Sequence, residues 1–363
     1  MAAKASEAAA SDIRSHPAAP RRTLLWALLV ASVLLLIGLV AGSVWVYRAL
    51  YSPSAFVTHY LTLLHEGRAA DALQLPGVNL TPEMVESSEL NANASPALLR
   101  HAALAPLNDI VITDEHREGD EYVVTASYTA NKHEGSTQFR VKSDGFKVLA
   151  PQWQFAESPL AQLDVRIFGS EQFRINNFDL DRLQIDPSGD PDAPMQLLVF
   201  SPGMYVISVQ TQIAQTKNGG VGFFSNVPLK ATAVDVQLEP TAEFTQTIQE
   251  RLDTVLDECV TNRVLMPANC PFGRVTSDIL DPDEPPLWSV VAYPKVELEP
   301  RGSDWIIKPT QGAVHLYAPV RLLHDGTDTV IDEDVPFEWA GIVQILPDGT
   351  AAIRLGSPTE FGF

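Results

Sequence analysis

The residues of this chain that could take part in chemistry are few, and the nearest to a catalytic arrangement is a histidine beside a carboxylate. His65 precedes Glu66 at the end of a predicted helix. A pair of this kind can move a proton where it borders a pocket. His101, Tyr128 and Trp153 are candidates to line the same pocket, because ligand sites combine apolar walls with a few polar groups. The competing interpretation places His65 on the surface and packs Tyr128 and Trp153 in the core.

Sequence motifs that carry a reaction mechanism are missing from the chain. It contains no GxxxxGKS/T phosphate loop, no GxSxG nucleophile elbow, no HExxH zinc helix and no SxxK pair. Two acidic stretches, residues 186–192 (DPSGDPD) and 325–334 (DGTDTVIDED), supply oxygen ligands of the calcium type but lack the spacing of a calcium loop. We therefore expect a non-enzymatic protein with no catalytic residue, no metal and no cofactor, and solvated loops at both acidic stretches.

Cys259 and Cys270 are the only cysteines of the chain. Their short separation suits a disulfide that closes a small loop in an oxidising compartment. Free buried thiols are the alternative. A zinc site would need further His or Cys ligands at suitable spacing, which the sequence does not supply. The pair therefore predicts a disulfide.

Helices followed by strands would position the candidate pocket residues. Pro53 suits the first turn of a helix and Gly67 its end, and apolar residues recur at helical spacing between them. From residue 110 to residue 155 the apolar residues alternate instead, and turn residues interrupt them three times. This pattern predicts a four-stranded antiparallel meander. The helices are expected to cover one face of the sheet, which gives an α+β domain.

Four segments of this region carry a resemblance to a known family. They are LLHEGRAADAL, GDEYVVTASYT, STQFRVKSDG and PQWQF, in the order helix, strand, strand and closing strand. Residues 53–156 resemble the extracytoplasmic nuclear transport factor 2-like domains that lie behind a single membrane span in Gram-positive bacteria. The resemblance implies a fold rather than an activity, because members of that fold include enzymes, binding modules and spacers.

The rest of the chain is predicted to form two further domains. Residues 159–240 contain short strands separated by turn residues, which indicates a small all-β domain resembling a sandwich. Residues 243–363 begin with an amphipathic helix and continue as antiparallel strands. Because this order repeats that of residues 53–156, the last domain is either a diverged repeat of the first or an unrelated α+β domain. The predicted fold class of the whole chain is α+β.

Residues 23–47 form an uncharged apolar run that is long enough, as a helix, to cross a hydrocarbon core of about 30 Å. Arg21 and Arg22 directly before it predict a cytoplasmic N-terminus. Residues 1–22 are then a disordered cytoplasmic tail. A signal peptide cleaved near residues 41–43 is the alternative, but the run exceeds the usual signal core of about 7–15 residues. We expect a single-pass protein of the cell membrane whose later domains are extracytoplasmic.

The acidic residues lie almost entirely after this apolar run. The chain has a formal net charge of −20, and of its 45 Asp and Glu residues only Glu7 and Asp12 precede residue 23. An acidic exterior repels nucleic acid and anionic lipid. Nucleic acid is therefore not an expected partner.

Three functional hypotheses fit these features. The leading one is a membrane protein, anchored in the lipid bilayer through residues 23–47, whose exterior binds or scaffolds an envelope component or a membrane protein. The second is a domain that binds or converts a small molecule in a nuclear transport factor 2-like pocket. The third is an envelope-stress sensor, suggested by the short tail before the apolar run.

Overall fold

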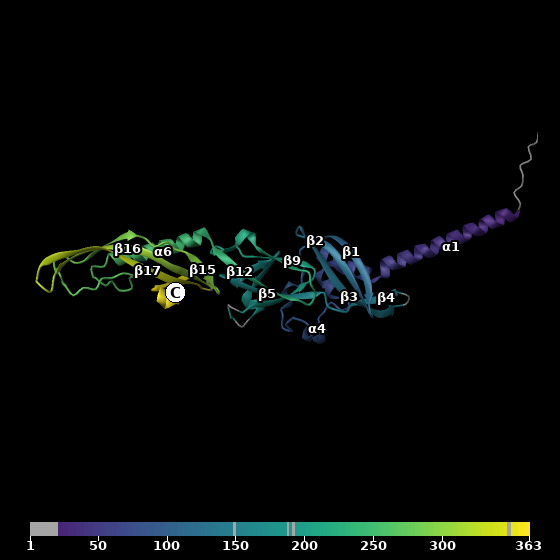
Figure 1. The fold of residues 1–363 in the computed structure, drawn as a ribbon, viewed down its shortest axis with the longest axis horizontal. Coiled ribbons are helices and arrows are strands. Elements are labelled where there is room, and N and C mark those ends of the chain that lie inside the picture. The colour runs from purple at the N-terminus through teal and green to yellow at the C-terminus, as the bar shows by residue number, and fades with distance from the viewer. Residues whose placement is uncertain (1–20, 148–149, 187–188, 191–192, 347–349) are drawn as a thin grey trace, which may run out of the picture.

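The computed structural model describes residues 21–147, 150–186, 189–190, 193–346 and 350–363, without the side chains of residues 21–25, 27, 41 and 43–49. Nearly all of the predicted cytoplasmic tail therefore lies outside the described residues. The molecule is elongated, and its parts follow one another in chain order (Figure 1). Helix α1 (Arg21–Tyr51) is at one end, and the long hairpin of β16 (Asp304–Arg321) and β17 (Asp328–Ile345) is at the other.

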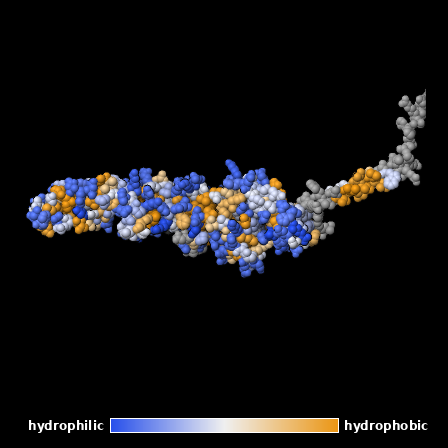
Figure 2. All heavy atoms as spheres, in the orientation of Figure 1, coloured by the Kyte–Doolittle hydropathy of each residue, from blue (hydrophilic) through white to orange (hydrophobic). Residues whose placement is uncertain are grey.

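Helix α1 covers the segment that was predicted to enter the membrane. The large apolar side chains described in it are exposed, among them Trp26, Leu28 and Leu36 at about 60% or more, and they form a continuous apolar surface (Figure 2). Among the residues whose side chains are described, no helix is both long enough and apolar enough to cross a membrane. Insertion of residues 23–47 into a bilayer stays a prediction.

The first folded part combines short helices with a four-stranded sheet, and the longest of these helices packs on the sheet. Its helices are α2 (Pro53–His65), α3 (Ala69–Leu73), α4 (Pro82–Glu86), η1 (Pro96–Leu98) and η2 (His101–Ala103). Its strands are β1 (Leu107–Glu118), β2 (Glu121–Ala130), β3 (His133–Lys147) and β4 (Ala150–Phe155). Their order is β1-β2-β3-β4 and every pairing is antiparallel, which confirms the predicted meander. Ser52 begins α2, because its hydroxyl accepts a hydrogen bond from the Ala55 amide at 3.1 Å.

The second part is a sandwich of two four-stranded sheets, ordered β10-β12-β5-β8 and β11-β9-β6-β7. The first sheet contains β5 (Leu160–Phe168), β8 (Met195–Phe200), β10 (Ala214–Thr216) and β12 (Ala231–Pro240). The second contains β6 (Gln172–Ile175), β7 (Phe178–Asp181), β9 (Gly203–Ser208) and β11 (Val221–Ser225). The short helices α5 (Arg182–Ile185) and η3 (Lys217–Gly219) connect strands. Strands β5 and β12 pair in parallel although they are far apart in the sequence. The sandwich is therefore not a simple series of hairpins.

The third part combines one long amphipathic helix with a six-stranded sheet. Helix α6 (Ala242–Val260) starts at Thr241, whose hydroxyl accepts from the Phe244 amide at 3.2 Å. The sheet contains β13 (Ile279–Leu280), β14 (Leu287–Ala292), β15 (Leu298–Arg301), β16, β17 and β18 (Ala351–Gly356), and η4 (Pro358–Phe361) follows it. Strands β13, β14 and β15 pair in turn with the same side of β16, so they act as one interrupted strand of a meander. The helix-then-meander order agrees with that of the first part, while common descent of the two stays a prediction.

Cys259 and Cys270 form the predicted disulfide, which ties the end of α6 to the following loop. Phe272 in that loop packs on Trp288 with a ring-centroid distance of 4.8 Å. Reduction is therefore expected to lower the free energy of unfolding by roughly 2–3 kcal/mol, because the unfolded chain gains conformational entropy once this short loop is no longer closed. Urea unfolding with and without reductant measures the difference. The double variant Cys259→Ser/Cys270→Ser should match the reduced protein, and an unchanged midpoint in both would contradict the role given to the bridge.

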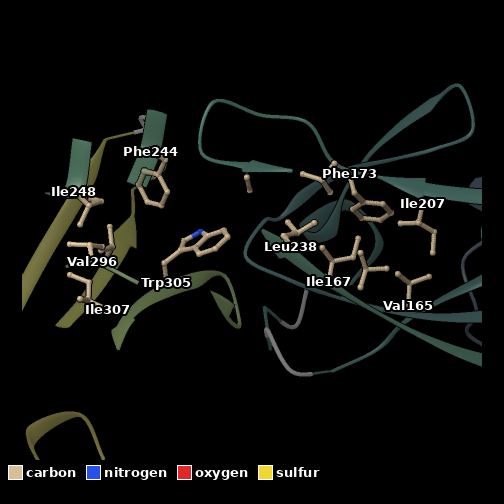
Figure 3. Close-up of a cluster of buried hydrophobic side chains, with 14 of the residues drawn as sticks. Val165, Ile167, Phe173, Ile207, Leu238, Phe244, Ile248, Val296, Trp305 and Ile307 are labelled. Atoms are coloured by element: carbon tan, nitrogen blue, oxygen red, sulfur yellow. The ribbon is translucent and has the colours of Figure 1, made fainter. Parts of the chain in front are cut away.

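The hydrophobic core does not divide where the predicted domains divide. One cluster joins α2 and the first sheet to Leu160, Phe200 and Met204 of the sandwich. A second cluster runs from the sandwich into α6 and the last sheet. Trp305 on β16 is fully buried where the last part meets the sandwich. Phe244 of α6 lies on one side of it, and Ile167 of the sandwich lies across the boundary (Figure 3). The folded parts are thus continuous in packing, which favours a stiff molecule over separate beads on a chain.

Candidate functional site

The two histidines predicted to border a pocket each contact a backbone carbonyl oxygen. His65 Nδ1 lies within hydrogen-bond distance of the Leu107 carbonyl oxygen. His101 Nδ1 is 2.9 Å from the carbonyl oxygen of Gly67. Gly67 has a φ of +72°, and a Cβ there would meet the His101 ring at 2.3 Å. The His65 ring therefore ties the end of α2 to the start of β1, and the His101 ring packs on the turn after α2.

Tyr128 lies in the core beside side chains that come from the sandwich. Its side chain is 2% exposed, and its hydroxyl is 2.7 Å from Thr137 Oγ1, which donates to the Asn226 carbonyl oxygen at 2.9 Å. Burial raises the pKa of the Tyr128 phenol to about 12. The Phe224 ring lies 5.9 Å from the Tyr128 ring, centroid to centroid. Phe224 on β11 thus occupies the space beside Tyr128 where the predicted pocket would open.

Trp153 is near the other end of the same sheet. Its indole Nε1 donates to the Tyr51 carbonyl oxygen at 2.9 Å, and its ring packs edge-on against Tyr122 at 5.3 Å. Tyr122 and Tyr128 are six residues apart on β2, which corresponds to about 20 Å along a strand. The structure therefore does not bring Trp153 and Tyr128 to one site. The hydrogen bond of Trp153 joins the first sheet to the end of α1.

Removing the Phe224 ring is expected to destabilise the protein and to open space beside Tyr128. Phe224 is partly buried and packs on the first core cluster. We expect Phe224→Ala to cost roughly 2–3 kcal/mol of unfolding free energy, somewhat less than a fully buried Phe. Urea unfolding measures this cost. Phe146→Ala is the matched control, because Phe146 is 73% exposed and should cost little. Equal midpoints for the two variants would show that Phe224 does not fill a structural gap.

Of four prominent cavities among the described residues, none is lined by His65, His101, Tyr128 or Trp153. Two of them, of about 430 and 800 Å³, border the joint between the first sheet and the sandwich and share Glu157 and Val227. The other two lie at the opposite end of the sandwich. These two share Gln172, Asp181 and Thr211, so they are neighbouring cavities.

The larger of this second pair, which we call the end cleft, has a volume of about 780 Å³. It is lined by strands β6 and β7, residues 208–211, residues 215–219 and Glu239. It exists because β6 and β9 separate: they pair only at Arg174–Ser208 and Ile175–Ile207. Beyond Ser208 the chain crosses to the other sheet, where the Thr216 amide donates to the Val209 carbonyl oxygen at 2.9 Å.

Four of the five charged side chains that line the end cleft pair with one another, and the fifth is Asp181. Arg174 holds Asp179 through two hydrogen bonds of 2.7 and 3.1 Å, and this contact lowers the pKa of the Asp179 carboxyl. Lys217 is 3.5 Å from Glu239. Among the described residues, no hydrogen bond involves the side-chain amides of Gln172, Gln210 or Gln215, all of which are exposed. Each amide offers both donors and an acceptor, so the cleft presents uncharged hydrogen-bonding capacity.

The smaller cavity of the pair, which we call the joint pocket, has a volume of about 500 Å³ and lies between the sandwich and the last sheet. Its apolar wall comes from Leu183, Ile213, Ile345 and Leu346. The turn at Ser303 closes it where the Gly169 amide donates to the Gly302 carbonyl oxygen at 2.6 Å.

The charged groups that line the joint pocket are all acidic. They are Glu171 and Asp181, and no Lys, Arg or His occurs among the described residues of the lining. Asp181 Oδ1 accepts from the Leu183 amide at 2.9 Å and so caps α5. The pocket therefore combines an apolar wall with unbalanced negative charge.

Metal chemistry finds no support in the described part of the chain. No group of three or more His, Cys, Asp or Glu side chains there is arranged to hold an ion. Residues 325–327 of the second acidic stretch lie in the turn of the β16–β17 hairpin, whereas residues 328–334 belong to β17 and not to the predicted loop. Asp328 there pairs with Arg321 at 2.7 Å. The stretch 186–192 is only partly described.

Sequence reasoning missed both the end cleft and the joint pocket. Their lining residues are scattered over residues 169–346 and are ordinary polar and apolar types. No residue type or spacing among them marks either cavity in the sequence.

Comparison of the chain with protein-family models, with curated proteins and with solved structures found no match.

Proposed function

We propose that the protein is a single-pass membrane protein whose elongated exterior binds a partner protein or envelope component and holds it away from the bilayer. The observation that carries the proposal is the linear order of the parts: an exposed apolar helix is at one end and the folded mass extends away from it (Figure 1). Arg21 and Arg22 at the start of that helix support the same orientation, because cationic residues are retained on the cytoplasmic side.

Continuous packing along the molecule supports the spacer role. Tyr60 of α2 donates from its hydroxyl to the Ser201 carbonyl oxygen at 3.1 Å, which links the first part to the sandwich. Trp305 links the sandwich to the last part. A surface held by such joints keeps its distance from the anchor, whereas flexibly linked domains would not. The nuclear transport factor 2-like resemblance of residues 53–156 remains part of the proposal and fits the observed helix-and-meander order.

Photo-crosslinking in living cells tests partner binding. A photoreactive residue at Gln210 in the end cleft should give a crosslinked species of one reproducible mass. The same residue at Gln152, an exposed position near α1, serves as the control for random collision. Identical crosslinking patterns at the two positions, or none at either, would contradict a specific partner surface.

A further inference from the structure

We propose that the end cleft and the joint pocket together bind an extended peptide segment of a partner protein, and that an apolar residue next to Lys or Arg occupies the joint pocket. This inference rests on the proposed function, since it specifies the chemistry of the partner. We refer to the two neighbouring cavities as the groove.

The end cleft has the chemistry that a peptide main chain needs. An extended peptide presents alternating N–H donors and C=O acceptors along its length. The exposed amides of Gln172, Gln210 and Gln215 can satisfy both kinds of group. The strand β6 itself is already closed off on this side, because Ser170 Oγ accepts from the Gln172 amide at 3.2 Å and donates to the Gln172 carbonyl oxygen at 2.8 Å. Recognition therefore falls to side chains rather than to strand addition.

The joint pocket selects the side chains of such a peptide. Leu183 is 49% exposed and Leu346 is 38% exposed, so both offer apolar surface to an incoming aliphatic or aromatic side chain. Glu171 and Asp181 border that surface without a basic neighbour in the described lining. A cation beside the apolar residue would neutralise them, whereas an acidic residue would be repelled.

The shape of the groove favours a chain segment over a compact molecule. Each cavity alone falls in the size range of small-molecule sites, about 300–1,000 Å³. The two share Gln172, Asp181 and Thr211 in their linings, so side by side they extend from the end of the sandwich to the last sheet. An extended peptide, which advances about 3.3 Å per residue, can follow such a path.

Other occupants fit the groove less well. A second copy of the chain would bring a net charge of −20 against the same charge. A saccharide would use an exposed aromatic ring as a platform, yet the only aromatic residue in the described lining is Phe173, which is 4% exposed.

Selection from a random library tests the inference without knowledge of the partner. Phage displaying random seven-residue peptides are selected on the full chain held in lipid nanodiscs. We expect the selected peptides to be enriched in Lys or Arg adjacent to Leu, Ile, Val or Phe. A selected peptide should bind Glu171→Lys about tenfold more weakly than the unaltered chain, because attraction becomes repulsion. Glu134→Lys makes the same charge change at a remote exposed position and should leave binding unchanged.

Each result decides between the groove and the wider proposal. Acidic or unenriched peptides, or equal binding to Glu171→Lys and Glu134→Lys, would overturn the assignment of the groove. Leu183→Ser provides an independent check on the apolar wall and should also weaken binding. If crosslinking in cells still captures a partner of one mass while the peptide result is negative, the proposed function stands and only the peptide chemistry assigned to the groove fails. Loss of both would end the proposed function as well.

Discussion

Residues 53–156 expressed alone are expected to lack a cooperative fold, although they contain a complete helix-and-meander unit. Their core is completed by Leu160, Phe200 and Met204, which lie outside that segment. The fragment would also lose both acceptors of the buried Tyr60 hydroxyl, the carbonyl oxygens of Pro159 at 3.4 Å and Ser201 at 3.1 Å. The free-energy cost of the exposed apolar surface and of the lost Tyr60 hydrogen bonds together exceeds the net stability of a domain of about 100 residues.

Thermal unfolding followed by near-ultraviolet circular dichroism measures this expectation. Residues 53–363 are the control and should show one sharp transition, because both core clusters are then complete. Strong binding of a hydrophobic dye by residues 53–156 would agree with an open core. A sharp transition of that fragment, with fixed tertiary signal, would show that the sandwich is not needed to complete it.

Truncation of Trp305 is expected to cost more stability than truncation of either Phe224 or Trp153. The Trp305 side chain is fully buried, and it packs edge-on against Phe244 with the ring centroids 5.8 Å apart. Its ring also approaches Gly169, where a Cβ would lie 2.9 Å from Trp305 Cζ2. Trp305→Ala should therefore lower the unfolding free energy by about 3–5 kcal/mol, the usual cost of removing a large buried aromatic side chain.

Two further variants separate packing from hydrogen bonding at this position. Trp305 Nε1 is buried and has no acceptor among the described residues, so Trp305→Phe loses volume but no hydrogen bond. It should cost clearly less than Trp305→Ala. Trp153→Ala controls for loss of a partly exposed tryptophan and should also cost less. Urea unfolding gives the free energy of unfolding of all three variants. A Trp305→Ala midpoint equal to that of Trp153→Ala would show that the packing between the sandwich and the last part does not depend on Trp305.

Much of the local structure could be predicted because it depends on local sequence. Pro53 and Gly67 mark the limits of α2 and its following turn, and alternation of apolar residues predicts the four strands up to Phe155. The disulfide was predictable because only two cysteines occur. In each case a periodicity or a residue type determines the structure over a few residues.

The failures concern contacts between residues far apart in the chain. The alternation of Tyr128 with polar neighbours is the pattern of a core residue and also of a pocket residue. Only the position of Phe224, 96 residues later in the chain, distinguishes these two interpretations. Predicted domain limits likewise gave no sign that Trp305 would join two regions in one core. The groove could not be predicted because it arises where β6 and β9 stop pairing, and no residue type marks that position.

Sidedness is the claim on which the proposed function depends most, and one labelling measurement tests it directly. Asp120 lies fully exposed in the turn between β1 and β2. A cysteine placed there by Asp120→Cys should be the accessible thiol, since Cys259 and Cys270 are bridged. A membrane-impermeant maleimide applied to intact cells is predicted to label the variant, and the labelled chain should remain in the membrane fraction. Labelling that requires cell lysis, or labelled chain recovered in the medium, would contradict the proposed orientation and anchoring.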